Sequence, residues 1–119
     1  MDALSHLELA VLTAIADQQT DQAESLRQQI GLAYLVGRRN TGAGFYATLG
    51  VRGAPPRVEI ASPVGDVGAD VDGVPDGMGF LLWLRDGLLG QLEGYTYTGS
   101  IEGRDLTALR YSNLGPRLR

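Results

Sequence analysis

The residues best suited to do chemistry lie near the end of a glycine-rich stretch. Glu93 is followed at alternate positions by Tyr95 and Tyr97. Residues two apart on a strand point to the same face, so these three side chains can share a pocket. A carboxyl group on an apolar face has a raised pKa and can act as a general acid. The alternative is structural, with Glu93 paired to Arg57 or Arg38 and holding the sheet together.

Two further groups complete the candidate site. Trp83 is the only tryptophan, and together with the tyrosines it belongs to the residue types enriched at protein interfaces. Arg38 and Arg39 are adjacent, and paired guanidinium groups suit a carboxylate or another anion. Their simpler role is to stabilise the C-terminal end of a helix, because a positive charge interacts favourably with the negative end of the helix dipole. The sequence therefore predicts binding residues and no catalytic residue, and the binding set is Glu93, Tyr95, Tyr97, Trp83, Arg38 and Arg39.

The composition excludes several kinds of chemistry. The chain has 119 residues, no cysteine, no lysine and a single histidine, His6. Thiol catalysis, iron–sulfur clusters, Schiff-base lysines, P-loop lysines and His-rich metal sites are therefore excluded, and we expect no cofactor. The formal net charge of −4 disfavours nucleic acid as a partner, because phosphates would be repelled.

Two short motifs resemble known ligand sites without matching them. Aspartates interleave with glycine over residues 66–76, and Asp70-Val71-Asp72-Gly73 begins like a calcium loop. Its glycine comes two places early and no glutamate stands at the twelfth position, so we expect solvated turns and no metal site. Gly42-Ala43-Gly44 lies between a predicted helix and a strand, the reverse of the order in a dinucleotide-binding loop.

Two helices are expected in the first third of the chain. Ser5 and Glu8 have the spacing of a capping box, and an apolar stripe follows at helical intervals, which predicts a helix over residues 6–17. Asp21 and Glu24 repeat the spacing, and a second stripe predicts a helix that ends near Val36-Gly37. The helical pair thus spans 5–37. Nothing in the chain is long and apolar enough to span a bilayer, and no basic leader precedes the first helix. We expect a cytoplasmic protein that contacts no membrane.

Over residues 42–97 the apolar residues recur at every second position, as in strands, instead of at helical intervals. Short candidates lie at 45–51, 57–61 and 67–71, and two longer runs are joined by Asp86-Gly87, the preferred dipeptide of a type I′ hairpin. Simple alternation across that turn places Leu84 opposite Leu89 and Phe80 opposite Glu93. Residues 80–84 are apolar at every position, which indicates a central strand with both faces covered. The second face would meet the C-terminal segment 98–119, which has a frayed end, or a second subunit.

These elements predict an α+β fold in a single domain of residues 1–119. Two N-terminal helices pack on a mostly antiparallel sheet of four to six strands, with the hairpin at its centre.

A family resemblance supports the same fold. The run from Gly79 to Tyr97 reads G-F, a hydrophobic strand, D-G and then L-E-G-Y-T-Y, and Thr41–Phe45 adds T-G-x-G-F upstream. This combination resembles small uncharacterised bacterial proteins of similar length. Such proteins often continue into Trp-Pro after the tyrosines, where this chain has Thr98-Gly99. The resemblance implies a shared fold and no particular activity.

Two functions from different classes remain open. The first is a non-enzymatic protein-binding module, such as an immunity or antitoxin protein, whose acidic surface steers a basic partner toward it. The second is a small-molecule or enzymatic pocket around Glu93, Tyr95 and Tyr97. A homodimer without a visible active site is a further possibility. An enclosed pocket at these residues would favour the second function, and an exposed aromatic patch would favour the first.

Overall fold

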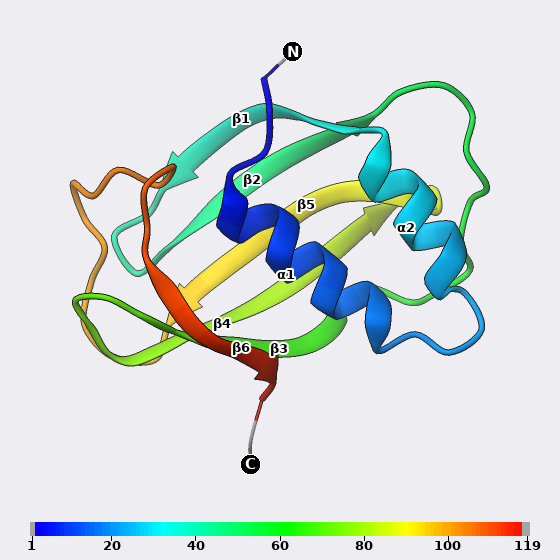
Figure 1. Ribbon diagram of the computed structural model, residues 1–119. Helices are drawn as coiled ribbons and strands as arrows, with labels where there is room; N and C mark the ends of the chain where they lie inside the picture. Colours follow the sequence, from blue (N-terminus) through cyan, green and yellow to red (C-terminus); the bar gives the residue numbers. More distant parts are fainter. Residues whose placement is uncertain (1, 118–119) are drawn as a thin grey trace.

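The computed structural model describes residues 2–117 and confirms the α+β prediction (Figure 1). Two helices precede a six-stranded sheet of order β1-β2-β5-β4-β3-β6, in which every neighbouring pair is antiparallel. The helices are α1 (His6–Asp17) and α2 (Ala23–Gly31). The strands are β1 (Ala33–Asn40), β2 (Gly44–Val51), β3 (Val64–Val71), β4 (Val74–Arg85), β5 (Leu88–Thr96) and β6 (Tyr111–Pro116).

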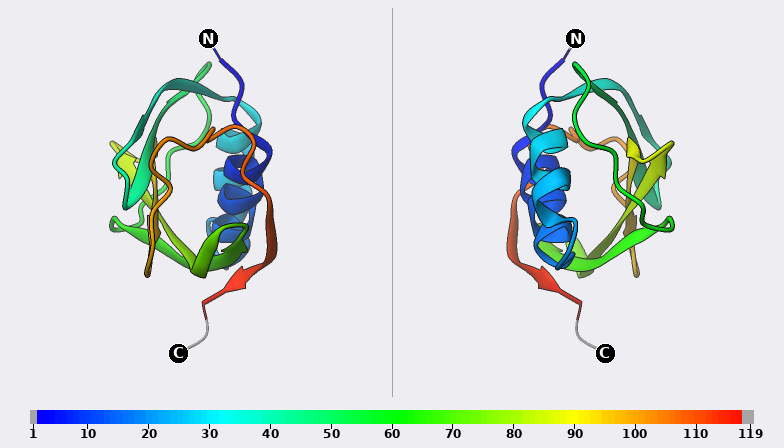
Figure 2. Two further views of the ribbon diagram at one scale, coloured as in Figure 1. Left: turned by 90° about the vertical axis from the view of Figure 1, so that its left-hand side faces the viewer. Right: turned by 90° about the vertical axis from the view of Figure 1, so that its right-hand side faces the viewer.

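The sheet curves around the helices and so has an inner and an outer face (Figure 2). Helix α1 lies against the inner face, and β6 comes round to contact it from the far side. Side chains alternate between the faces along each strand. The inner ones form one core with the buried side of α1, and its largest fully buried side chains include Leu12, Ile15, Met78, Phe80, Leu82 and Leu92.

Helix α1 begins as the sequence predicts. The Ser5 hydroxyl accepts a hydrogen bond from the Glu8 main-chain N–H at 3.1 Å, and the Glu8 carboxylate accepts one from the Ser5 N–H at 2.7 Å. This capping box satisfies two main-chain donors that the first turn would otherwise leave unpaired.

The second helix is present, but the predicted position of its C-terminal end and the predicted cap at its N-terminal end are wrong. Helix α2 stops at Gly31, and residues 33–37, assigned above to the helical pair, belong to strand β1. Glycine weakens the helix there, and Leu35 gains a strand partner in Leu49 of β2. No side chain caps the start of α2, so Asp21 and Glu24 form no capping box.

The hairpin turn is confirmed, but its register is not the one predicted. Asp86 and Gly87 both have positive φ, at 53° and 77°, as a type I′ turn requires. Leu84 does pair with Leu89. The register then shifts by one residue between Trp83 and Leu84, so the predicted pairing of Phe80 with Glu93 is wrong.

The bulge reverses the face of everything beyond it on β5. Phe80 pairs with Gly94, and Glu93 pairs with Leu81 on the outer face. One extra residue in a strand of period two moves each later side chain to the opposite side.

In the described part of the C-terminal segment, Arg117 contacts the outer face at Tyr95 and Tyr97. The segment forms β6, an edge strand that the sequence did not predict and that pairs with β3. The predicted frayed end, residues 116–119, begins at the last residue of β6, and its residues 118–119 lie outside the described residues. The loop before it places Ile101 and Leu109 in the core. Residues 57–61, a predicted strand, form none.

In the motifs that carry the family resemblance, several glycines are in such close contact with neighbouring groups that a side chain would clash. A Cβ on Gly94 would lie 2.4 Å from the Phe45 ring, and one on Gly44 would lie 2.1 Å from the Gly94 carbonyl oxygen. On the outer face, a Cβ on Gly79 would lie 2.5 Å from the Tyr95 ring. The T-G-x-G-F and E-G-Y-T-Y motifs therefore pack against each other, which is a structural reason for their pattern.

Candidate functional site

The outer face of the sheet carries an aromatic surface that no element of residues 2–117 covers. Trp83 and Tyr97 are 38% and 42% exposed, and Tyr46, Leu81 and Tyr95 are half-buried beside them. We call these five residues the outer aromatic patch. Four of them lie on β2, β4 and β5, where alternation along the strands turns them outward, and Tyr97 directly follows the last residue of β5.

Glu93 lies within this patch rather than under the sheet. Its Oε1 accepts a hydrogen bond from Trp83 Nε1 at 3.0 Å, and its neighbour on β2 is Tyr46. Neither arginine weighed as its partner reaches it, because Arg38 binds Glu8 and Arg57 donates to the Asp86 carbonyl. The predicted position of Glu93 on the apolar face is therefore wrong, and its carboxylate orients the indole of Trp83.

Tyr95 and Tyr97 do lie together, as predicted. Their rings meet edge to face with centroids 5.6 Å apart, and Arg117 donates to the Tyr95 hydroxyl at 2.7 Å. Partial burial, followed by the neighbouring Tyr97, raises the pKa of Tyr95, against a smaller opposing effect of Arg117. The Tyr95 phenol is therefore neutral at pH 7, where it can donate or accept a hydrogen bond but cannot serve as a phenolate base.

The two adjacent arginines have different roles because they point to opposite faces of β1. Arg39 is exposed, and its guanidinium carbon lies 5.3 Å from the centroid of the Tyr46 ring. Arg38 points inward and grips Glu8 through two hydrogen bonds of 2.7 Å. That pairing raises the pKa of Arg38 further, against the cost of its burial. Arg38 is therefore a structural cation on a strand, and neither the anion site nor the helix-end role fits it.

A groove follows the boundary between β2 and β5, and the sequence analysis did not identify it. The two strands pair only as far as Thr48 and Gln91. Three adjoining hollows with volumes of about 400, 150 and 230 Å³ lie along this boundary, and all three share Thr48. We call them the β2–β5 groove. Their lining includes Arg39, Tyr46, Gln91, Trp83, Arg85 and Arg57.

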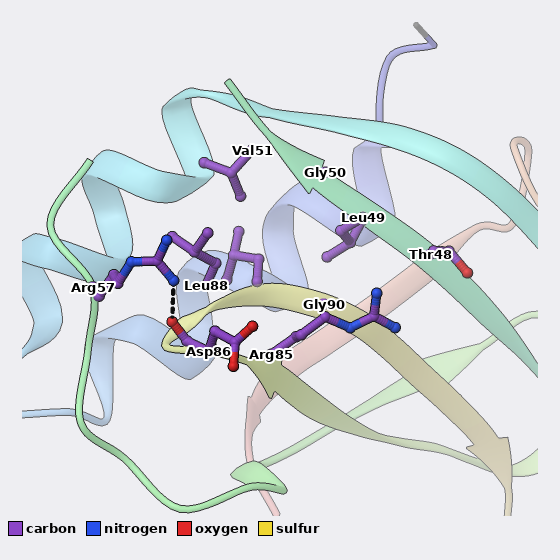
Figure 3. A pocket seen from close by; sticks show the side chains of 10 residues that line it. Thr48, Leu49, Gly50, Val51, Arg57, Arg85, Asp86, Leu88 and Gly90 are labelled. Carbon is purple, nitrogen blue, oxygen red and sulfur yellow. Dashed lines mark hydrogen bonds between the residues drawn. The ribbon is translucent and has the colours of Figure 1, made fainter. Parts of the chain in front are cut away.

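The end of the groove beside the hairpin turn is shown in Figure 3. Arg57 and Arg85 flank it on opposite sides, with Asp86 between them and the side chains of Val51 and Leu88 close by. Arg57 donates to the Asp86 carbonyl oxygen at 2.6 Å. Glu93, Tyr95 and Tyr97 do not line these hollows.

The aspartate-rich segment shows no ligand geometry. Asp70 accepts from Asn113, and Asp76 accepts from Thr98. Within residues 2–117, no three histidine, aspartate or glutamate side chains gather as a metal site would need. None of the helices in that part of the chain is long and apolar enough to cross a membrane.

Comparisons with protein-family models, with curated proteins and with solved structures find no match to this chain. The family resemblance and the function both stay predictions.

Proposed function

We propose that the chain is a non-enzymatic protein-binding module, and that the outer aromatic patch contacts the partner. The observation that carries this proposal is the exposure of Trp83 and Tyr97 on a sheet face that no described element of the chain covers. Tryptophan, tyrosine and arginine dominate binding energy at protein interfaces. Their rings offer a large contact area at a small cost in conformational entropy.

Arginine–tyrosine stacks strengthen the case. Arg39 lies over Tyr46 and Arg117 lies over Tyr97, at 5.3 and 5.5 Å from the ring centroids. Each stack holds a guanidinium in place while leaving donors for a partner. An immunity or antitoxin role, with a cytoplasmic setting, belongs to this class of function. The charge of the partner, however, follows from the patch and not from the net charge of the whole chain.

The small-molecule alternative has weaker support. It needs Glu93, Tyr95 and Tyr97 to line a common cavity, whereas all three lie at the surface of the patch. The β2–β5 groove nearby has none of these three side chains in its lining.

The test compares partner retention by matched variants. Wild type, the double variant Trp83→Ser/Tyr97→Ser and the control Leu9→Ser on helix α1 are tagged, purified at low salt from cells that encode the protein, and analysed by native mass spectrometry. Leu9 is 42% exposed, as much as Tyr97, but lies on the helical side. We expect the double variant to lose its partner by at least about tenfold, because each hot-spot residue contributes about 2 kcal/mol or more.

Thermal unfolding of the three proteins provides the control for folding. Melting temperatures within a few degrees of wild type show that the loss is one of contact. A second copy of the chain that is lost from the double variant also supports the proposal. A partner kept equally by all three proteins, or the absence of any partner from wild type, contradicts it.

A further inference from the structure

Building on the protein-binding function proposed above, we infer that the β2–β5 groove binds an extended acidic segment of the partner, whose carboxylates contact Arg39, Arg85 and Arg57. The groove adjoins the outer aromatic patch, since Tyr46 and Trp83 belong to both. One partner can therefore fill the groove and cover the patch together.

The shape of the groove suits an extended chain. It follows β2 from Tyr46 to Val51, a distance of about 17 Å at about 3.3 Å per residue. That length accommodates about five residues of extended peptide. The hollows succeed one another along β2 and all include Thr48 in their lining, which favours a linear ligand over a compact one.

The charge of the groove is opposite to that of the whole chain. Arg39, Arg57 and Arg85 are exposed, and no carboxylate of residues 2–117 lies within 4.0 Å of their guanidinium nitrogens. Asp86 is the one acidic side chain in the described lining of the groove. Glu93 lies outside this lining, and its carboxylate accepts a hydrogen bond from Trp83. Guanidinium groups pair with carboxylates through two parallel hydrogen bonds, which makes acidic side chains the matching ligand.

The acidic end of the molecule lies too far away to cancel this field. Strand β4 has 12 residues, carries Asp76 near its start and runs from the turn that holds Asp72 to Arg85. Its length is about 36 Å at about 3.3 Å per residue. The Debye length at physiological salt is about 8 Å, so the two ends are screened from each other.

Main-chain groups favour a peptide over a nucleic acid. Beyond Thr48, residues 49–51 of β2 keep β1 on one side and have no strand partner on the side of β5. An extended peptide can pair with such an edge. Val51 and Leu88 give this end an apolar floor for an aliphatic side chain between the acids. The sugar-phosphate backbone of a nucleic acid has no main-chain N–H and C=O groups in this arrangement and so cannot pair with a strand edge.

The experiment uses the fluorescence of Trp83, the single tryptophan, which lines the groove. The folded chain is titrated with the peptide acetyl-Glu-Glu-Leu-Glu-Glu-amide, with its all-glutamine counterpart and with a five-residue thymidine oligonucleotide. Amide chemical shifts of Leu88 to Gln91 map the site by NMR. Arg85→Gln and the control Arg110→Gln each remove one exposed positive charge, and Arg110 lies beside the acidic end because Tyr111 pairs with Val71.

The acidic peptide alone should bind, and added salt should weaken it. Arg85→Gln should lower its affinity about tenfold through the loss of a charge-assisted hydrogen bond, whereas Arg110→Gln should change it less than about twofold. Equal binding of the two peptides, no binding, or tighter binding of the oligonucleotide would overturn the inference. A partner that is lost from Trp83→Ser/Tyr97→Ser but kept by Arg85→Gln overturns the groove assignment alone. A partner kept by both overturns the binding function of the patch.

Discussion

Replacing Gln29 with leucine should destabilise the protein by about 2–4 kcal/mol, although the two side chains are similar in size. Gln29 is fully buried between α2, the hairpin turn and the loop after β2. Its amide nitrogen donates to the carbonyls of Pro56 and Gly87, and its oxygen accepts from the Leu89 N–H, each at 2.9 Å. Leucine would leave the buried Leu89 N–H unpaired and would take its donor from the Pro56 carbonyl, whereas the Gly87 carbonyl keeps a hydrogen bond from the Val58 N–H. Each group left unpaired on burial costs about 1–3 kcal/mol.

The neighbouring glutamine provides the control. Gln28 is exposed on the same helix, so Gln28→Leu should change the free energy of unfolding by less than about 0.5 kcal/mol. Urea unfolding of both variants measures the difference, and hydrogen exchange of the Leu89 amide should accelerate in Gln29→Leu alone. If the free energy of unfolding of Gln29→Leu lies within about 1 kcal/mol of the wild-type value, the side chain does not hold these segments together.

Arg38→Met should destabilise the protein by about 3–5 kcal/mol, because it leaves the carboxylate of Glu8 buried without its cation. Glu8 is 1% exposed and receives both guanidinium contacts as well as the Ser5 N–H. Removing one partner of a buried pair costs more than the pair contributes. The double variant Glu8→Leu/Arg38→Met should therefore recover much of the loss.

Arg39→Met provides the matched control, since Arg39 is the next residue on β1 and faces outward. Its effect on stability should be below about 1 kcal/mol. Unfolding of wild type and the three variants in guanidinium chloride measures the order of their stabilities. Equal midpoints for Arg38→Met and Arg39→Met would show that the ion pair with Glu8 contributes no stability.

The sequence predicted those elements that begin at a helix-capping motif or are joined by a dipeptide typical of a tight turn. The capping box of Ser5 and Glu8 located α1, and Asp86-Gly87 located the hairpin. The end of α2 escaped because residues 33–36 fit a helical stripe as well as a strand, and only pairing with β2 decides between them. Strand β6 escaped because it is a short edge strand that contains asparagine, glycine and proline.

The site was predicted in part, and a single bulge accounts for the main error. The extra residue between the pairs Trp83–Gln91 and Leu84–Leu89 is Gly90, which leaves no mark in the hydrophobic pattern. It moved Glu93 to the outer face. Trp83, Tyr95, Tyr97 and Arg39 also lie at that face, but Arg38 does not. The groove residues Thr48 and Gln91 form no motif, and only their outward positions on β2 and β5 could have indicated them.

The role of the outer aromatic patch is tested most directly by hydroxyl-radical footprinting of the complex isolated from the native cell. Oxidation of each side chain is quantified by mass spectrometry in the free chain and in the complex. Trp83 and Tyr97 should become several-fold less reactive in the complex, while Leu9 on α1 should stay as reactive as in the free chain. Protection of Leu9 with unchanged reactivity of Trp83 and Tyr97 would place the partner on the helical side and contradict the proposal.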